Sequence, residues 1–248
     1  MKLKKTALLF ALAARSVLGQ DKQEPAQNIA ACKVAFQAYD AERAGADNAG
    51  NASLQPPPVA IDITQLFAEP KYDTALSLRD LQNPGNNIPG RKLPQKLIGL
   101  TVVKPVVQMQ VASEIIETDE GLSCSRVMNA KVQTGYTDMK VYIAREFPPN
   151  SCAYDEIKRH EQKHVDDYIS VAARTMPSLQ ESLATYLNEN RVYADKSDYD
   201  RRLEAWQKEA YGKLDEAGNK SRIALDTPEE YNRLSQACNG AVMARLLA

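Results

Sequence analysis

The stretch YDEIKRHEQKHVDDYI, residues 154–169, contains both histidines of this 248-residue chain. His160 and His164 are four residues apart, and Glu161 follows the first of them. Apolar and aromatic side chains recur at helical spacing through the same stretch, which therefore predicts a helix. Because residues four apart share one face of a helix, the two imidazole rings are expected to lie side by side.

Two imidazoles and an adjacent carboxylate suit metal-assisted hydrolysis. On such a helix His160 and His164 can bind one zinc ion, and Glu161 can reach a water molecule on that metal. Zinc lowers the pKa of its water to about 7 and polarises a carbonyl group, and a glutamate can pass the water proton to a leaving amine. We therefore predict Zn²⁺ on His160 and His164, with Glu161 as the catalytic general base. The alternative is a charged helix with two surface histidines.

Strand patterns precede this helix and helical patterns follow it. Three segments have β character, and the last two are expected to form a hairpin with a turn near GYTD: residues 98–116, 125–135 and 138–147. Pro177 is expected to open a second helix, and a charged third helix follows. Thr227 and Pro228 are expected to cap and open the last helix. These patterns predict an α+β fold, with a small, mainly antiparallel sheet followed by a helical C-terminal half.

The N-terminus predicts export. Residues 1–19 combine a lysine-rich start with a short apolar run and read as a secretory signal peptide, cleaved after Gly19, although an amphipathic N-terminal helix is the alternative. No other stretch is apolar enough to span a membrane. Residues 1–19 hold four of the 31 basic side chains and none of the 32 acidic ones, so the remainder has a net charge of about −5. That charge argues against nucleic acid as a partner.

The rest of the chain divides into two predicted regions. Residues 20–59 are expected to form one helix and a linker rich in proline, glycine and asparagine, and residues 60–248 the hydrolase domain. Four cysteines, an even number in an exported chain, favour two disulfides over free thiols. Of the three possible pairings, the expected hairpin favours Cys124 with Cys152, which leaves Cys32 with Cys238.

The segment from Ile98 to Met176 resembles a known enzyme family. The strand MKVYIAREF (139–147), the turn that contains Cys152 and the helix with His160, Glu161 and His164 are similar to the zincin metallopeptidases. More narrowly, SCAYDEIKRHEQKHV (151–165) resembles a family of uncharacterised exported bacterial proteins, domain of unknown function 922. The resemblance implies a zincin-like fold, zinc on the two histidines, a catalytic glutamate, and an edge strand that holds extended substrate.

This sequence departs from the zincin pattern in two ways. Lys163 stands before the second histidine, where active zincins usually have uncharged residues. The chain also has no third histidine, so a glutamate from a later helix is expected to be the third zinc ligand; the candidates are Glu189, Glu229 and Glu230.

Together these observations predict a periplasmic or secreted zinc metallopeptidase acting on a peptide or another amide. The alternative is a non-catalytic, disulfide-stapled protein of the cell envelope that binds a partner and keeps a structural or decayed metal site. The sequence leaves the substrate and the oligomeric state open.

Overall fold

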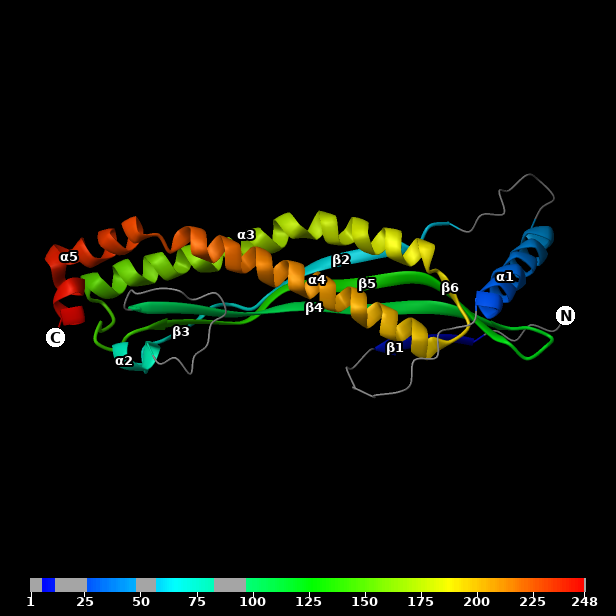
Figure 1. The fold of residues 1–248 in the computed structure, drawn as a ribbon, viewed down its shortest axis with the longest axis horizontal. Coiled ribbons are helices and arrows are strands. Elements are labelled where there is room, and N and C mark those ends of the chain that lie inside the picture. The colour runs from blue at the N-terminus through cyan, green and yellow to red at the C-terminus, as the bar shows by residue number, and fades with distance from the viewer. Residues whose placement is uncertain (1–5, 12–25, 48–56, 83–96, 248) are drawn as a thin grey trace. The chain divides into compact units, whose positions relative to one another are not determined.

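The computed structural model describes residues 6–11, 26–47, 57–82 and 97–247. Strands dominate the chain up to Ile143 and helices follow from Cys152 (Figure 1), so the expected mixture of a sheet and a helical C-terminal half is confirmed. The elements in chain order are β1 (Thr6–Ala11), α1 (Ala26–Asp47), β2 (Ala60–Phe67), β3 (Lys71–Asp73), α2 (Leu78–Leu81), β4 (Gly99–Glu117), β5 (Ser123–Ile143), α3 (Cys152–Glu189), β6 (Val192–Tyr193), α4 (Lys196–Leu225) and α5 (Pro228–Leu247).

The strands form one mixed sheet in the order β1-β4-β5-β2, and β3 and β6 also pair with β5. β1 pairs with β4 and β6 with β5 in antiparallel orientation, whereas β3 pairs with β5 in parallel. β5 thus has partners on both sides. The expectation that residues 139–147 form an edge strand was wrong, because β5 carries most of them inside the sheet.

The chain folds into two compact units that interleave along the sequence. Unit 1 comprises residues 1–64, 107–133 and 176–210, and unit 2 comprises residues 65–106, 134–175 and 211–248. The long strands β4 and β5 and the long helices α3 and α4 each contribute one part to each unit. The predicted metal-binding residues belong to unit 2.

The predicted hairpin near GYTD does not form, because β5 runs without a turn from Ser123 to Ile143. Gly135 and Asp138 have φ values of 151° and 53° inside this strand, so the residues expected to turn the chain only make it locally irregular. A Cβ at Gly135 would lie 2.1 Å from the carbonyl oxygen of Leu66. The glycine therefore serves the close approach of β2.

Two disulfides are present, but their pairing differs from the favoured one. Cys32 pairs with Cys124, and Cys152 pairs with Cys238. Pairing Cys124 with Cys152 depended on the hairpin, and a single strand carries the chain away from Cys124 instead. Each bond lies within one unit, since the first joins α1 to the start of β5 in unit 1 and the second joins the start of α3 to α5 in unit 2.

The Cys32–Cys124 disulfide is part of the core of unit 1. Both cysteines are fully buried, and they pack with aromatic and aliphatic side chains of α1 and β4: Phe36, Tyr39 and Ile116. Beside this cluster the guanidinium group of Arg126 donates to both carboxylate oxygens of Asp40, at 2.5 and 2.9 Å, and to Glu114 at 2.7 Å. This buried charge is therefore paired as well as hydrogen-bonded.

Helix α3 is longer than expected. It continues through Pro177, which was expected to open a separate helix, and ends at Glu189. Proline removes one backbone hydrogen bond from a helix, but Leu179, Leu183 and Leu187 beyond it remain buried at helical spacing. Their packing offsets the lost bond. At the other end, the Ser151 hydroxyl accepts a hydrogen bond from the Tyr154 amide at 3.2 Å, so Ser151 caps the helix.

No helix in the described part of the chain is both long and apolar enough to cross a bilayer. The segment predicted as a signal peptide contains β1. The expected cleavage position after Gly19 and residues 48–56 of the predicted linker lie outside the described residues. The two disulfides are compatible with an extracellular or periplasmic location.

Candidate metal centre

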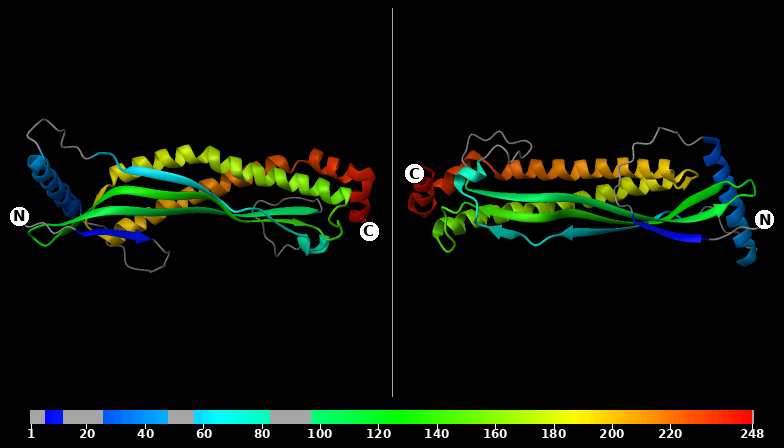
Figure 2. Two further views of the ribbon diagram at one scale, coloured as in Figure 1. Left: turned by 180° about the vertical axis from the view of Figure 1, so that it is seen from behind. Right: turned by 90° about the horizontal axis from the view of Figure 1, so that it is seen from below.

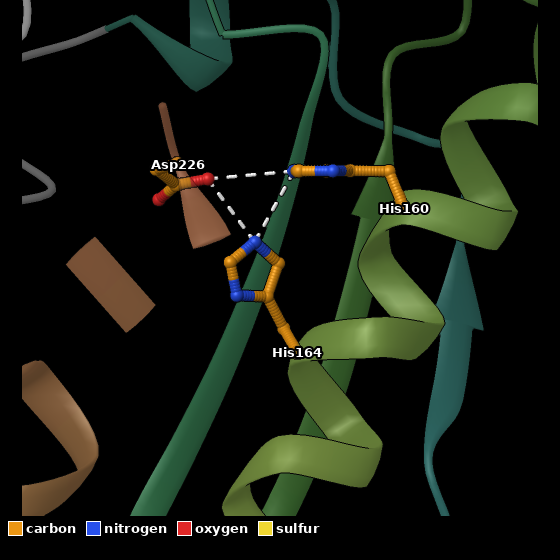
Figure 3. Close-up of side chains that lie close together, drawn as sticks. All are labelled: His160, His164 and Asp226. Atoms are coloured by element: carbon orange, nitrogen blue, oxygen red, sulfur yellow. Dashed lines mark hydrogen bonds and ion pairs between the residues drawn. The ribbon is translucent and has the colours of Figure 1, made fainter. Parts of the chain in front are cut away.

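Helix α3 presents the two histidines on one face, as expected. His160 and His164 are 3 % and 4 % exposed, and their Nε2 atoms are 3.2 Å apart. Their rings meet edge to face, with centroids 4.8 Å apart. Both Nε2 atoms therefore point to the same place beside the helix (Figure 3).

The third residue at this place is Asp226, which follows the last residue of α4. Its Oδ1 atom lies 3.1 Å from the Nε2 atom of His164 and 3.4 Å from that of His160 (Figure 3). The other oxygen, Oδ2, faces Arg222 one turn earlier in α4, with Nη1 at 3.6 Å. Arg222 thus leaves Oδ1 directed at the two imidazoles.

Glycine and aromatic packing bring α4 to this position in unit 2. A Cβ at Gly218 would lie 2.6 Å from the Tyr136 hydroxyl oxygen and 3.1 Å from the Tyr168 ring, so a larger residue would require one of these tyrosines to shift. The hydroxyl group of Tyr136 also donates to the carbonyl of Leu214 at 3.0 Å. This close packing positions α4, and with it Asp226 about two turns further along the chain.

The three donor atoms fit a zinc ion. Ligand bonds of about 2.0–2.1 Å at tetrahedral angles place neighbouring ligand atoms about 3.3 Å apart. The three observed separations are 3.1, 3.2 and 3.4 Å. Two imidazole nitrogens and one carboxylate oxygen are also a donor set that zinc accepts. Among the described residues, this cluster gathers no fourth histidine, cysteine or acidic residue.

None of the three glutamates predicted as the third ligand takes that place in the described cluster. Glu189 belongs to unit 1, and Glu229 is exposed in the first turn of α5. Glu230 lies close by, but its Oε1 atom is 3.2 Å from His160 Nδ1, on the far side of the ring from Nε2. The carboxylate that joins the two histidines is instead that of Asp226, three residues before Glu229.

Glu230 occupies the position of an outer partner for a metal-binding histidine. With Nε2 of His160 on a metal, Nδ1 carries the proton and donates it to Glu230, which fixes the ring. Lys163 donates to the same Oε1 atom at 2.9 Å, and Arg233 donates to both carboxylate oxygens. Lys163, the charged residue that departs from the zincin pattern, thus points away from Nε2 and helps to hold α5 on α3.

The Cys152–Cys238 disulfide fastens the same two helices. It joins the first residue of α3 to α5, and Figure 2 shows α5 beside that end of α3. Near this bond the chain leaves helical geometry, since Cys238, Asn239 and Gly240 have φ values of 59°, 56° and 79°. Asparagine and glycine tolerate this left-handed backbone best.

Glu161 is 4 % exposed and faces β4. The Thr101 hydroxyl donates to its Oε2 atom at 2.7 Å. Its Oε1 atom lies beside Gly99, where a Cβ would approach it to 2.4 Å. No sequence pattern linked β4 to the glutamate, because this contact joins residues 60 positions apart.

The metal-free cluster is strongly coupled electrostatically. Burial disfavours the charged form of Asp226, but hydrogen bonds with His160 and His164 outweigh it and hold the pKa of this carboxyl group well below its ordinary value. For His160, burial lowers the pKa, and the bonds to Asp226 and Glu230 together with the charge of Glu161 raise it overall. Burial raises the pKa of Glu161 despite the neighbouring imidazoles.

Comparison with known proteins adds no assignment, since no family model, curated protein or solved structure matches the chain. The resemblance to zincins and to the family of exported bacterial proteins stays a prediction. Function is therefore inferred from the geometry of the site itself.

Proposed function

We propose that this protein is an exported zinc-dependent hydrolase, and specifically a metallopeptidase. The observation that supports this proposal is the triangle of His160 Nε2, His164 Nε2 and Asp226 Oδ1, with edges of 3.1–3.4 Å. Three protein ligands with the fourth position left for water is the pattern of a catalytic zinc site, whereas structural sites use four protein ligands.

Each residue has a defined role in this proposal. His160, His164 and Asp226 hold the metal, and Glu161 takes the proton from the attacking water and returns it to the leaving amine. Bound zinc supplies a water of lowered pKa and polarises the scissile carbonyl group. Burial of the glutamate favours proton uptake, because it raises the pKa of the carboxyl group.

The proposed substrate is an extended polypeptide segment. Zincins hold such substrates on an edge strand, and β4 is the strand that contacts the general base through Gly99 and Thr101. In unit 2, β4 is hydrogen-bonded to β5, and among the described residues β1 pairs only with positions 110–115 of β4, in unit 1. The first part of β4 therefore replaces residues 139–147 as the proposed substrate strand.

A second function has one observation in its favour. His160, Glu161 and His164 are each no more than 4 % exposed, as expected for a structural metal site in a disulfide-stapled binding protein. Turnover distinguishes the two functions, because a structural site leaves no position for a reacting water.

The test combines zinc content with hydrolysis of fluorescein-labelled casein. Wild-type protein is expected to bind about one zinc per chain and to cleave casein. His160→Ala should lose both properties, whereas Glu161→Gln should keep zinc and lose cleavage. Cleavage by the zinc-loaded Glu161→Gln protein would contradict the mechanism, and a zinc-loaded wild type that cleaves nothing would favour the structural site.

A further inference from the structure

We infer that Gly99 and Thr101 of β4 are positioning residues that hold the Glu161 carboxylate in its working orientation. This inference rests on the proposed function and adds a part that the zinc-binding motif does not contain. It concerns how the general base is aimed, since a carboxylate on a helix can adopt several rotamers.

The first observation is that Thr101 engages only one carboxylate oxygen. Its hydroxyl group donates to Glu161 Oε2 at 2.7 Å, within the range of a strong bond to a charged acceptor. The same hydroxyl lies 3.3 Å from the Glu161 carbonyl oxygen. Thr101 is 6 % exposed, so water does not compete for this contact. Oε1 receives no hydrogen bond from Thr101 and lies beside Gly99.

The second observation is the space at Gly99. A Cβ there would lie 2.4 Å from Glu161 Oε1 and 2.9 Å from both Cδ and Cγ, so any other residue would displace the carboxylate. The backbone does not require glycine here, because Gly99 is not among the residues with positive φ. Room for the glutamate is the remaining physical reason for a glycine at this position.

Strand geometry links the two observations. Residues two apart in a strand face the same side of the sheet, so the gap at Gly99 and the hydroxyl group of Thr101 meet the same side chain of α3. Gly99 gives the carboxylate its space and Thr101 fixes its rotation. A pre-oriented base spares the reorientation that a mobile one would need before each proton transfer.

The test uses binding of acetohydroxamate to the zinc-loaded protein, so that it does not depend on knowing the substrate. This ligand chelates zinc as an anion and passes its proton to the neighbouring base, so its affinity reports whether Glu161 is in place. Calorimetry would compare wild type with Thr101→Val, which keeps the shape without the hydroxyl, and with Thr101→Ser, which keeps the hydroxyl. Glu161→Gln supplies the value for a missing base.

Thr101→Val is expected to bind zinc as wild type does and acetohydroxamate about tenfold more weakly, close to Glu161→Gln, because a hydrogen bond to a charged group is lost. Thr101→Ser should restore most of the affinity. On casein, the valine variant should lose kcat with little change in KM.

Unchanged acetohydroxamate affinity in Thr101→Val would overturn the inference and leave the proposed function intact. Loss of zinc by Thr101→Val would overturn it as well, by assigning Thr101 to the fold rather than to the base. A wild-type protein without zinc would overturn both proposals.

Discussion

Replacing Asp226 with asparagine should weaken zinc binding by two to three orders of magnitude. The change keeps the size of the side chain and removes the charge from the oxygen that lies 3.1 and 3.4 Å from the two Nε2 atoms. Zinc sites with four protein ligands bind with about 10–16 kcal/mol, or about 3–4 kcal/mol per ligand. Since each 1.4 kcal/mol is about tenfold in affinity, losing one ligand corresponds to about a hundredfold to a thousandfold.

The assay is competition for zinc against a chromophoric chelator at neutral pH. Glu229→Gln is the matched control, because it removes an exposed carboxylate three residues further on and should leave the affinity within about twofold of wild type. Glu230→Gln, which loses the outer partner of His160, should fall between them, at about tenfold to a hundredfold weaker. Wild-type affinity in Asp226→Asn, with a larger loss in Glu230→Gln or Glu189→Gln, would refute the assignment of Asp226.

Four further predictions concern pH, the space at Gly99 and the Cys152–Cys238 disulfide. Zinc affinity should fall with decreasing pH from a point above 6.5, because the pKa of His160 is raised and zinc must displace its proton; a titration flat between pH 6 and 8 would contradict this. The interaction of Asp226 with His160 should stabilise the metal-free protein most between pH 3.8 and 6.5. The lowered pKa of Asp226 contributes stability above its unfolded value of 3.8, and this stability is lost as the pH falls, whereas the stability from the raised pKa of His160 is present below 6.5 and is lost as the pH rises. Thermal melts across this range check the prediction. Gly99→Ala should keep zinc yet lose most casein cleavage, because its methyl group would lie 2.4 Å from the Glu161 carboxylate. Full activity would show that Glu161 can adopt another working conformation. Cys152→Ser with Cys238→Ser opens a loop of 86 residues and should lower the free energy of unfolding by up to about 4–5 kcal/mol, measured by denaturant titration, and an unchanged midpoint would refute this estimate.

Local patterns predicted much of the secondary structure. The helix around His160 and the Pro228 start of α5 were predicted from neighbouring residues, and the structure contains both. The errors came where distant contacts override local signals. The sequence predicts a turn beginning at Gly135, but this glycine allows β2 to approach β5, and the residues around it give no sign of that contact.

The site was predicted in part for the same reason. Four-residue spacing identifies His160 and His164 as a pair, whereas Asp226 comes from a segment 62 residues beyond His164. An aspartate just after a helix is ordinarily a capping or solvent-exposed residue, and the position of Asp226 beside the histidines depends on packing at Gly218 that brings α4 beside α3. The cysteine pairing failed through its dependence on the hairpin.

The order of the proposed zinc ligands along the chain has a consequence for the timing of zinc binding. During synthesis the two histidines emerge well before Asp226, which lies 62 residues after His164. Until then the histidines form an incomplete site, which should bind zinc more weakly by the binding free energy of one ligand. Under the proposed function, zinc binding and hydrolysis should therefore reach full strength only after residue 226 has emerged.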